Sequence, residues 1–183
     1  MLPFIIIIVV AVVIILWAFG MYNGLIGKRN EVDRAYSDMD VSLKKRFDLV
    51  PNLVETVKGL AKQESSVFDK VTNARAAVAG ASNTDDRFKA EAQLSTSLRG
   101  LFALVESTPQ LVSAPAFQNL NDQLSGIETD IQSSRRYYNG SVLQYNNAIQ
   151  MVPTNIVAKL LGFKVRPLFE IEQAEKEAPK VQF

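Results

Sequence analysis

Residues 2–19 read LPFIIIIVVAVVIILWAF, an apolar run without a charged side chain. At a helical rise of about 1.5 Å per residue the run covers about 27 Å, and the next three residues extend it to the polar edge of a bilayer. Trp17 and Tyr22 carry amphipathic rings that favour a membrane interface. The sequence therefore predicts a transmembrane helix that contacts the lipid bilayer through residues 2–22, within an N-terminal anchor of residues 1–24.

A secretory signal peptide is the alternative interpretation of this run, because Ala18-Phe19-Gly20 resembles a small-x-small cleavage site. However, no Lys or Arg precedes the run, whereas a signal peptide usually begins with a basic region. The run is also longer than the roughly 7 to 15 apolar residues of a signal peptide. We therefore expect an anchor that is not cleaved.

Basic residues beside the run set the expected orientation. Lys28, Arg29 and Arg34 follow it closely, and no basic residue precedes it. Because positively charged flanks favour the cytoplasmic side, we expect a single-pass protein of the cell inner (plasma) membrane, with its N-terminus outside and its helical domain in the cytoplasm. A periplasmic or other extracytoplasmic domain is the alternative, since the translocated N-terminus is short.

The residues after the anchor have the size of a single domain and a balanced charge. The chain contains 20 Lys and Arg against 19 Asp and Glu, which does not favour nucleic-acid binding. It contains no Cys and no His. These absences exclude disulfides, the common zinc sites, haem ligation by His, Cys catalysis and His-dependent triads.

Apolar residues recur at steps of three and four from Val32 onwards, which predicts amphipathic helices. Pro51 falls inside the first stripe, and because the phase of the stripe survives it, we expect a kinked helix with Asp48, Pro51 and Asn52 at the kink. A new helix capped by Asp48 is the alternative. The first stripe consists of Val32, Tyr36, Met39, Leu43, Phe47, Val50, Val54, Val57, Ala61, Phe68, Val71 and Val78.

A turn at residues 80–85, with Asn83 or Thr84 as a helix cap, separates the first stripe from two further ones. A short helix over 155–161, capped by Thr154 and stopped by Gly162, follows them. No window alternates as a half-buried strand would, so the fold class is all-α: an antiparallel helical bundle of residues 25–165 and a partly disordered C-terminal tail of residues 166–183. The second stripe runs through Phe88, Glu91, Leu94, Leu98, Leu101, Phe102 and Val105, and the third runs from Phe117 to Ile149 before Pro153.

Several motifs make the chain similar to the bacterial LemA family. The most specific is Arg-x-Asp-Leu-x-Pro-Asn-Leu at residues 46–53, together with Arg-Arg-x-Tyr-Asn at residues 135–139. Tyr36 stands where the family more often has Trp. The resemblance implies one N-terminal membrane helix and a LemA-like bundle of the four-helix type. It implies no catalytic residue and no cofactor, and only a membrane-organising or adaptor role, since one relative acts in magnetosome formation.

Charged residues on the stripes form a candidate structural polar network. Glu64 and Arg75 occupy positions of the first stripe that would otherwise be apolar. Because an unpaired buried charge is costly, we expect each to meet an opposite charge from the third long helix, which also fixes the helix register. The functional alternative makes Glu64 and Arg75 part of a polar pocket. A separate functional interpretation is that Arg135 and Arg136 clamp a phosphate or a carboxylate. The network consists of Glu64, Arg75, Glu128, Arg135, Arg136 and Asn139.

Three other groups of polar residues have structural interpretations. Lys44-Lys45-Arg46 is interpreted as a solvated face, because acidic residues lie on neighbouring turns. Tyr138 and Tyr145 fall on the third stripe and are assigned to the core. Asp48, Asn52 and Glu55 offer oxygen atoms, but no loop gathers them into a cation site. We therefore predict no metal site, no cofactor and no catalytic residue.

The function expected from these features is that of a membrane-anchored, non-enzymatic helical scaffold or adaptor that organises protein partners. A self-assembling, membrane-shaping homo-oligomer is the alternative, because Gly20 and Gly24 have the small-xxx-small spacing that allows helices to approach closely. A less favoured interpretation is a carboxylate-dependent hydrolase that uses Glu64, Asp48 or Glu128 as acid or base.

Overall fold

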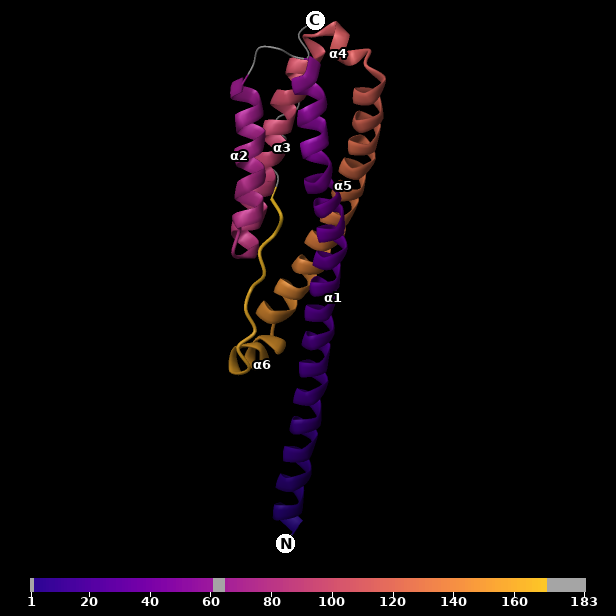
Figure 1. Cartoon of the computed structure of the whole chain (residues 1–183). Helices are drawn as coiled ribbons and strands as arrows, with labels where there is room; N and C mark the ends of the chain where they lie inside the picture. Colours follow the sequence, from indigo (N-terminus) through magenta and orange to yellow (C-terminus); the bar gives the residue numbers. More distant parts are fainter. Residues whose placement is uncertain (1, 61–64, 171–183) are drawn as a thin grey trace, which may run out of the picture. The chain divides into compact units, whose positions relative to one another are not determined.

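The described part of the chain forms helices and no strands (Figure 1). A computed structural model describes residues 2–60 and 65–170. Its helices are α1 (Leu2–Leu60), α2 (Ser65–Gly80), α3 (Thr84–Glu106), α4 (Pro109–Val112), α5 (Pro115–Gln150) and α6 (Thr154–Leu160). The predicted all-α class is confirmed.

The chain divides into two compact units, each described by itself. Of the described residues, unit 1 contains 2–38 and 136–168, and unit 2 contains 39–60, 65–135, 169 and 170. The helices α1 and α5 therefore each contribute one part to unit 1 and another part to unit 2.

Unit 1 joins the first part of α1 to the end of α5 and to α6. Large apolar side chains of residues 2–19 are exposed, and among the described helices α1 alone is long and apolar enough to cross a membrane. From Leu25 onwards, one face of α1 is buried within the unit. The apolar run and the partly buried residues that follow it thus belong to one continuous helix, α1. The buried residues of the unit include Leu25, Val32, Ala35, Tyr138, Val142, Tyr145, Ile149 and Ala158.

Unit 2 is a bundle of four helical segments. The end of α1, then α2, α3 and the start of α5 run alternately in opposite directions (Figure 1), which is the up-down-up-down arrangement of a four-helix bundle. The single turn α4 connects α3 to α5. All five elements place apolar residues in one core, among them Val57, Val71, Leu94, Leu101, Leu111 and Leu124.

The first stripe belongs to two helices rather than one. α1 ends at Leu60 and α2 begins at Ser65, although Val57 and Phe68 enter the same core. The prediction that the first stripe forms a single kinked helix is therefore wrong. A period of three to four residues marks which side chains are buried, and here it keeps its phase across two helices. Pro51 lies inside α1, which excludes a new helix at Asp48. The bend at Pro51 stays a prediction.

The predicted helix ends are mostly confirmed. Asn83 is the N-cap of α3, and its side-chain oxygen accepts a hydrogen bond from the Asp86 N–H at 2.9 Å. Gly162 follows α6 with φ +72°, and the N–H of Phe163 donates to the Ala158 carbonyl at 3.0 Å, a Schellman ending. The predicted cap at Thr154 is wrong: its hydroxyl donates to the Met151 carbonyl, and Pro153 is the N-cap.

Candidate functional site

A buried arginine links three helices of unit 2. Arg46 of α1 donates to the Glu91 carboxylate of α3 at 2.7 Å and to the Glu128 carboxylate of α5 at 2.9 Å. It also donates to the Ser95 hydroxyl at 2.9 Å. The exposed fraction is 1% for Arg46 and 0% for Glu91. We call Arg46, Glu91 and Glu128, with Arg87, the Arg46 cluster.

The local sequence explains why these charged groups are buried. Arg46 follows Leu43 by three residues and precedes Val50 by four, so α1 turns it toward the core. Glu91 lies between Phe88 and Leu94 on the buried face of α3. The helices therefore place both charges inside the bundle, where each requires a partner.

The charges of the Arg46 cluster are balanced. Glu91 accepts a second hydrogen bond from the Arg87 guanidinium at 2.9 Å, so two arginines face two glutamates. Burial lowers the pKa of Arg46, but the nearby carboxylates of Glu128 and Glu91 outweigh this effect, and the pKa lies above its ordinary value. Among the described residues, the Arg46 Nε–H has no hydrogen-bond partner.

A cavity of about 330 Å³ lies between α3 and α5 beside this cluster, near the lower end of the range for ligand pockets. Arg135 lines it, and its guanidinium lies 5.8 Å from the ring centroid of Phe169. That ring stacks on Phe88, with the two centroids 4.4 Å apart. The apolar lining residues include Leu98, Phe102, Leu124, Ile131 and Phe169, and the polar ones include Ser95, Arg99, Glu128, Gln132 and Glu170.

The charge of the lining favours an anionic group. Apart from the ion pair of Arg46 and Glu128, the charged residues that line the cavity in the described part of the chain are Arg99, Arg135 and Glu170. A guanidinium beside an apolar wall suits a carboxylate attached to an apolar group, since its planar donors pair with both oxygens of the carboxylate. The cavity can therefore bind and orient such a group.

The structure brings only part of the predicted polar network together. Glu128 and Arg135 both line the cavity, whereas Arg136 and Asn139 belong to unit 1. Arg136 is exposed, and Asn139 is partly buried. Glu64 lies outside the described residues.

The predicted partner of Arg75 is wrong. Arg75 of α2 donates to the backbone carbonyl of Phe47 at 3.2 Å, and its guanidinium lies 3.9 Å from the centroid of the Phe47 ring. Glu128, the carboxylate of the predicted network on the third long helix, pairs with Arg46 instead. A carbonyl and a ring face therefore satisfy this cation without a carboxylate from α5.

Arg46 is the residue that sequence reasoning missed. The solvated face predicted for Lys44-Lys45-Arg46 is correct for the two lysines, which are exposed, and wrong for Arg46. The spacing from Leu43 to Val50 could have identified it, and the presence of Glu91 on the second stripe could have suggested its partner.

The predicted kink residues lie outside the cavity lining. Asp48 forms an exposed ion pair with Lys44 at 3.3 Å, and Asn52 is exposed. Within residues 2–60 and 65–170, no three carboxylates gather closely enough to hold a metal ion.

Tyrosines of the third stripe are buried in unit 1, as predicted. The Tyr138 hydroxyl donates to the Pro167 carbonyl at 2.9 Å, and the Tyr145 hydroxyl donates to the Lys164 carbonyl at 3.0 Å. The Asn146 amide pairs with both backbone groups of Arg166 at 2.9 Å. These side chains fasten the extended segment 163–168, which we call the strap, along α5.

The exposed apolar part of α1 continues into packed helices. The chain therefore falls in the class of helical proteins that have a candidate membrane anchor near the N-terminus. The chain belongs to the LemA family, whose profile matches residues 35–183. This confirms the resemblance that the motifs carried.

Individual relatives are distant. The chain is similar to the magnetosome protein MamQ of Magnetospirillum gryphiswaldense, with 25% identity over 78% of this chain and 62% of the relative. It is also similar to protein LemA of Metamycoplasma hominis, with 24% identity over 86% and 72% of the two chains. Magnetosome protein MamQ 2 of Paramagnetospirillum magneticum is 25% identical over 84% and 66%. The chain thus spans less than two thirds of either MamQ protein.

Proposed function

We propose that this protein is a membrane-anchored, non-enzymatic scaffold that binds a partner protein through the cavity between α3 and α5. The observation that carries the proposal is the placement of Arg135, which lines the cavity against the ring of Phe169. Among the described residues, this arginine has no ion pair. An acidic side chain of a partner would supply one.

The lining indicates the chemistry of the partner. Its apolar side chains come from both α3 and α5, with the guanidiniums of Arg99 and Arg135 beside them. The ion pair of Arg46 and Glu128 closes one side, and the buried Arg46 cluster holds α1, α3 and α5 in register behind it. A preformed site costs less ordering on binding. We infer a segment of the partner in which an Asp or Glu lies beside apolar residues.

The structure gives no support to the hydrolase interpretation. Of its proposed carboxylates, Glu128 lines the cavity but is ion-paired with Arg46, and Asp48 lies outside the lining. Glu64 is outside the described residues. An acid–base mechanism needs a carboxylate within reach of a substrate proton and free to exchange it. The interpretation of the cavity as a binding site does not require such a carboxylate.

The anchor is the second part of the proposal. The apolar side chains of residues 2–19 are exposed in unit 1, and α1 continues without a break into the packed helix. A bilayer would cover these side chains. Lys28, Arg29 and Arg34 follow the run and support a cytoplasmic position for the helical part at the inner membrane.

Photo-crosslinking in intact membranes tests the partner site. A photoreactive residue at Gln132, which lines the cavity on α5, should give a discrete adduct with another protein. Gln144 is the matched control, because it is also an exposed glutamine of α5 but belongs to unit 1. The adduct should disappear in Arg135→Glu. Equal labelling from both positions, or an adduct that Arg135→Glu leaves intact, would remove the support for this site.

Self-assembly through α1 is the second candidate function. Gly20 and Gly24 lie one turn apart, and a Cβ added at either would meet nothing within 4 Å, so this face of α1 is open to a second helix. The MamQ relatives, named as magnetosome proteins, are compatible with an assembly role. Gly20→Leu with Gly24→Leu should then convert a detergent-extracted oligomer to a monomer, and a wild-type monomer would reject this candidate.

A further inference from the structure

Exposed apolar side chains cluster around α6. Among residues 23–150, the described large apolar residues that are exposed are isolated along the sequence: Val41, Val112, Tyr137 and Leu143. By contrast, five lie within eleven residues at α6, with exposed fractions from 56% for Leu161 to 79% for Leu160. Such a concentration marks an interaction surface. We call Met151, Val152, Ile156, Leu160 and Leu161 the α6 apolar surface.

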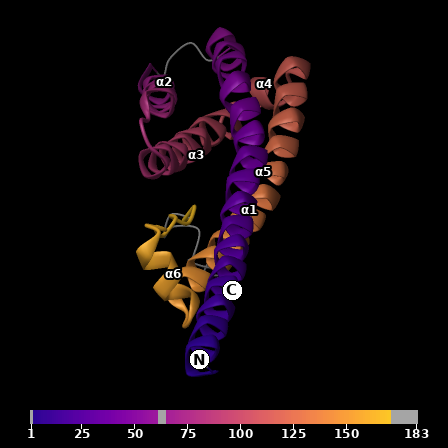
Figure 2. The same ribbon diagram turned by 90° about the horizontal axis from the view of Figure 1, so that it is seen from below.

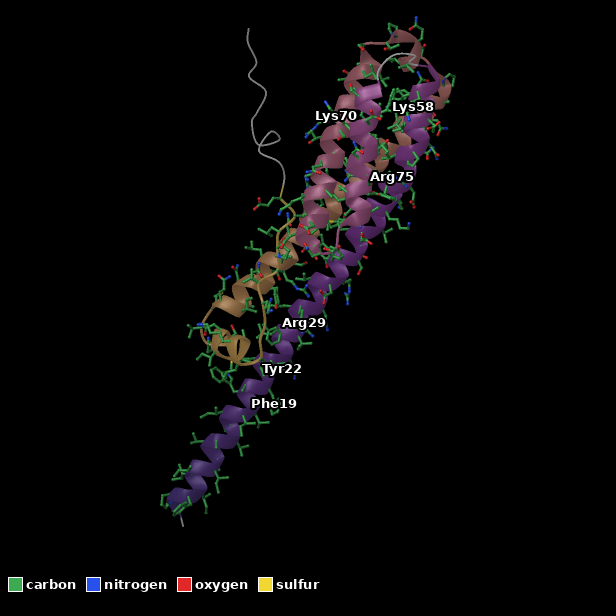
Figure 3. All side chains as sticks on the ribbon, turned by 60° about the vertical axis from the view of Figure 1, so that its left-hand side comes forward. Phe19, Tyr22, Arg29, Lys58, Lys70 and Arg75 are labelled. Atoms are coloured by element: carbon green, nitrogen blue, oxygen red, sulfur yellow. The ribbon has the colours of Figure 1, made fainter. Side chains whose placement is uncertain are left out.

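Ring contacts fix where this surface lies in unit 1. Phe163, two residues after Leu161, packs edge-to-face on Tyr22 of α1, with the ring centroids 6.1 Å apart. The Arg29 guanidinium lies 5.8 Å from the centroid of the same ring. Figure 3 shows α6 beside Tyr22 and Arg29, while α1 continues alone past Phe19, and Figure 2 shows α6 at the side of α1. The α6 apolar surface therefore lies at the end of the apolar run.

The strap holds α6 in this position. Tyr145 and Asn146 bind its backbone at Lys164 and Arg166, and the Arg166 guanidinium forms an ion pair with Asp33 of α1 at 3.0 Å. Gly162, with φ +72°, makes the sharp turn from α6 into the strap. The exposed residues of the α6 apolar surface thus lie on or beside a helix whose following segment is held by contacts with α5 and α1.

Bilayer dimensions place α6 at the lipid headgroups. Tyr22 lies three residues beyond Phe19, or about 4.5 Å further along the helix axis. The polar region on each side of the hydrocarbon core is about 5–7 Å thick. If residues 2–19 fill that core, the ring of Phe163 beside Tyr22 lies within the interface. The apolar side chains of α6 are then within reach of the acyl boundary.

The charges around α6 suit an anionic lipid surface. Residues 151–165 contain Lys159 and Lys164 and no acidic residue. Lys28 and Arg29 lie on α1 at the level of the Phe163 contact. Long basic side chains place their apolar stems along the interface and their charges among the headgroups. A lipid surface therefore satisfies both the apolar and the basic residues of this region.

We propose that α6 and its flanking turns are a second membrane-binding element, which lies on the bilayer surface from which α1 emerges and contacts anionic phospholipids. This inference goes beyond partner binding and rests on the proposed anchor. It gives the protein two attachments, one through the bilayer and one on its surface. The orientation of unit 1 to the membrane is then fixed by contacts on both α1 and α6.

The chain has no Cys, so a single fluorophore can be attached at any chosen position. Full-length protein carrying an environment-sensitive label at L161C is reconstituted into vesicles of phosphatidylcholine with phosphatidylglycerol, with or without quenchers on the lipid chains. L143C is the matched control, since Leu143 is 55% exposed and Leu161 is 56% exposed, both in unit 1. L16C, within the apolar run, reports on the anchor.

We expect blue-shifted emission and quenching by lipid at L161C and L16C, and neither at L143C. K159E with K164E should reduce the quenching at L161C and leave that at L16C unchanged. Quenching at L16C without quenching at L161C would overturn the α6 proposal and leave the anchor standing. A blue shift at L161C without quenching by lipid would also overturn it, because protein would then cover the surface. Water-exposed labels at both positions would reject the anchor itself.

Discussion

The carboxylate of Glu91 lies 2.7 Å from the guanidinium of Arg46, and both side chains are buried. This contact joins α1 to α3 across 45 residues of sequence, and Glu128 extends it to α5. The two contacts of Arg46 can form together only when the three helices have one relative register. It therefore shapes the wall of the cavity that we assign to a partner.

Removal of Glu91 should destabilise the protein strongly. Glu91→Ala leaves the buried Arg46 without its closest partner, and breaking a buried pair costs about 3–5 kcal/mol. Urea unfolding of the detergent-solubilised protein, followed by far-UV circular dichroism, measures this loss. Asp48→Ala removes an exposed ion pair with Lys44 and should change stability by less than about 1 kcal/mol.

A double substitution separates pairing from packing. Arg46→Met combined with Glu91→Leu removes both charges, so the double variant should be more stable than the sum of the single changes predicts. Additive losses would show that the two side chains contribute independently. The same urea titration supplies all four measurements of the cycle.

The stacking of Arg75 should depend on its planar shape. Arg75→Lys keeps the charge but loses the guanidinium face over Phe47, and we expect a loss of about 0.5–2 kcal/mol. Lys70→Ala is the control, because Lys70 is an exposed cation of the same helix (Figure 3). Equal stability of Arg75→Lys and the wild type would show that charge alone matters at Arg75.

The Tyr145 hydroxyl should make stability depend on alkaline pH. Burial raises the pKa of Tyr145 above its ordinary value of 10.0. Below pH 10, the free energy of unfolding of the wild type should exceed that of Tyr145→Phe by about 1 kcal/mol, because the wild type has the hydrogen bond to Lys164. As the pH rises above 10 the unfolded tyrosine loses its proton first, so this advantage should shrink. Melting temperatures of both proteins from pH 7 to 11 test it, and a constant difference would contradict it.

Gly162 and Gly140 should respond to alanine in opposite directions. Gly162 has φ +72°, so Gly162→Ala should cost about 1–2 kcal/mol and increase hydrogen exchange along the strap. Gly140 lies inside α5, where an added Cβ meets nothing within 4 Å. Gly140→Ala should therefore stabilise by about 0.5–1 kcal/mol. Losses of equal size at both positions would show that the turn at Gly162 has no special role.

The sequence predicts the elements of this fold well because they depend on local chemistry. The third stripe ends before Pro153, and Asn83 caps α3, as the residue types require. The end of α1 at Leu60 was not predictable from the stripe, since Val57 and Phe68 face one core from two helices. Periodicity identifies a buried face, and it carries no information on where the chain reverses.

The candidate site was harder to predict, because its contacts join distant parts of the chain. The partner of Glu128 lies 82 residues away in sequence, and the choice of Arg46 over Arg75 depends on how the helices pack. Of the predicted network, Glu128 and Arg135 reach the cavity. The two exposed lysines before Arg46 favour a solvated position for it, whereas its spacing from Leu43 indicates a buried one.

The summed mass of the protein chains in particles extracted from membranes in polymer nanodiscs tests the central claim most directly. The chain has a mass of 20.3 kDa. A scaffold that binds a partner through Arg135 should give a protein mass that exceeds this chain by the mass of a second protein, and Arg135→Glu should release that protein. A protein mass of one chain in both cases would contradict the account, and whole multiples of the mass of one chain would support self-assembly instead.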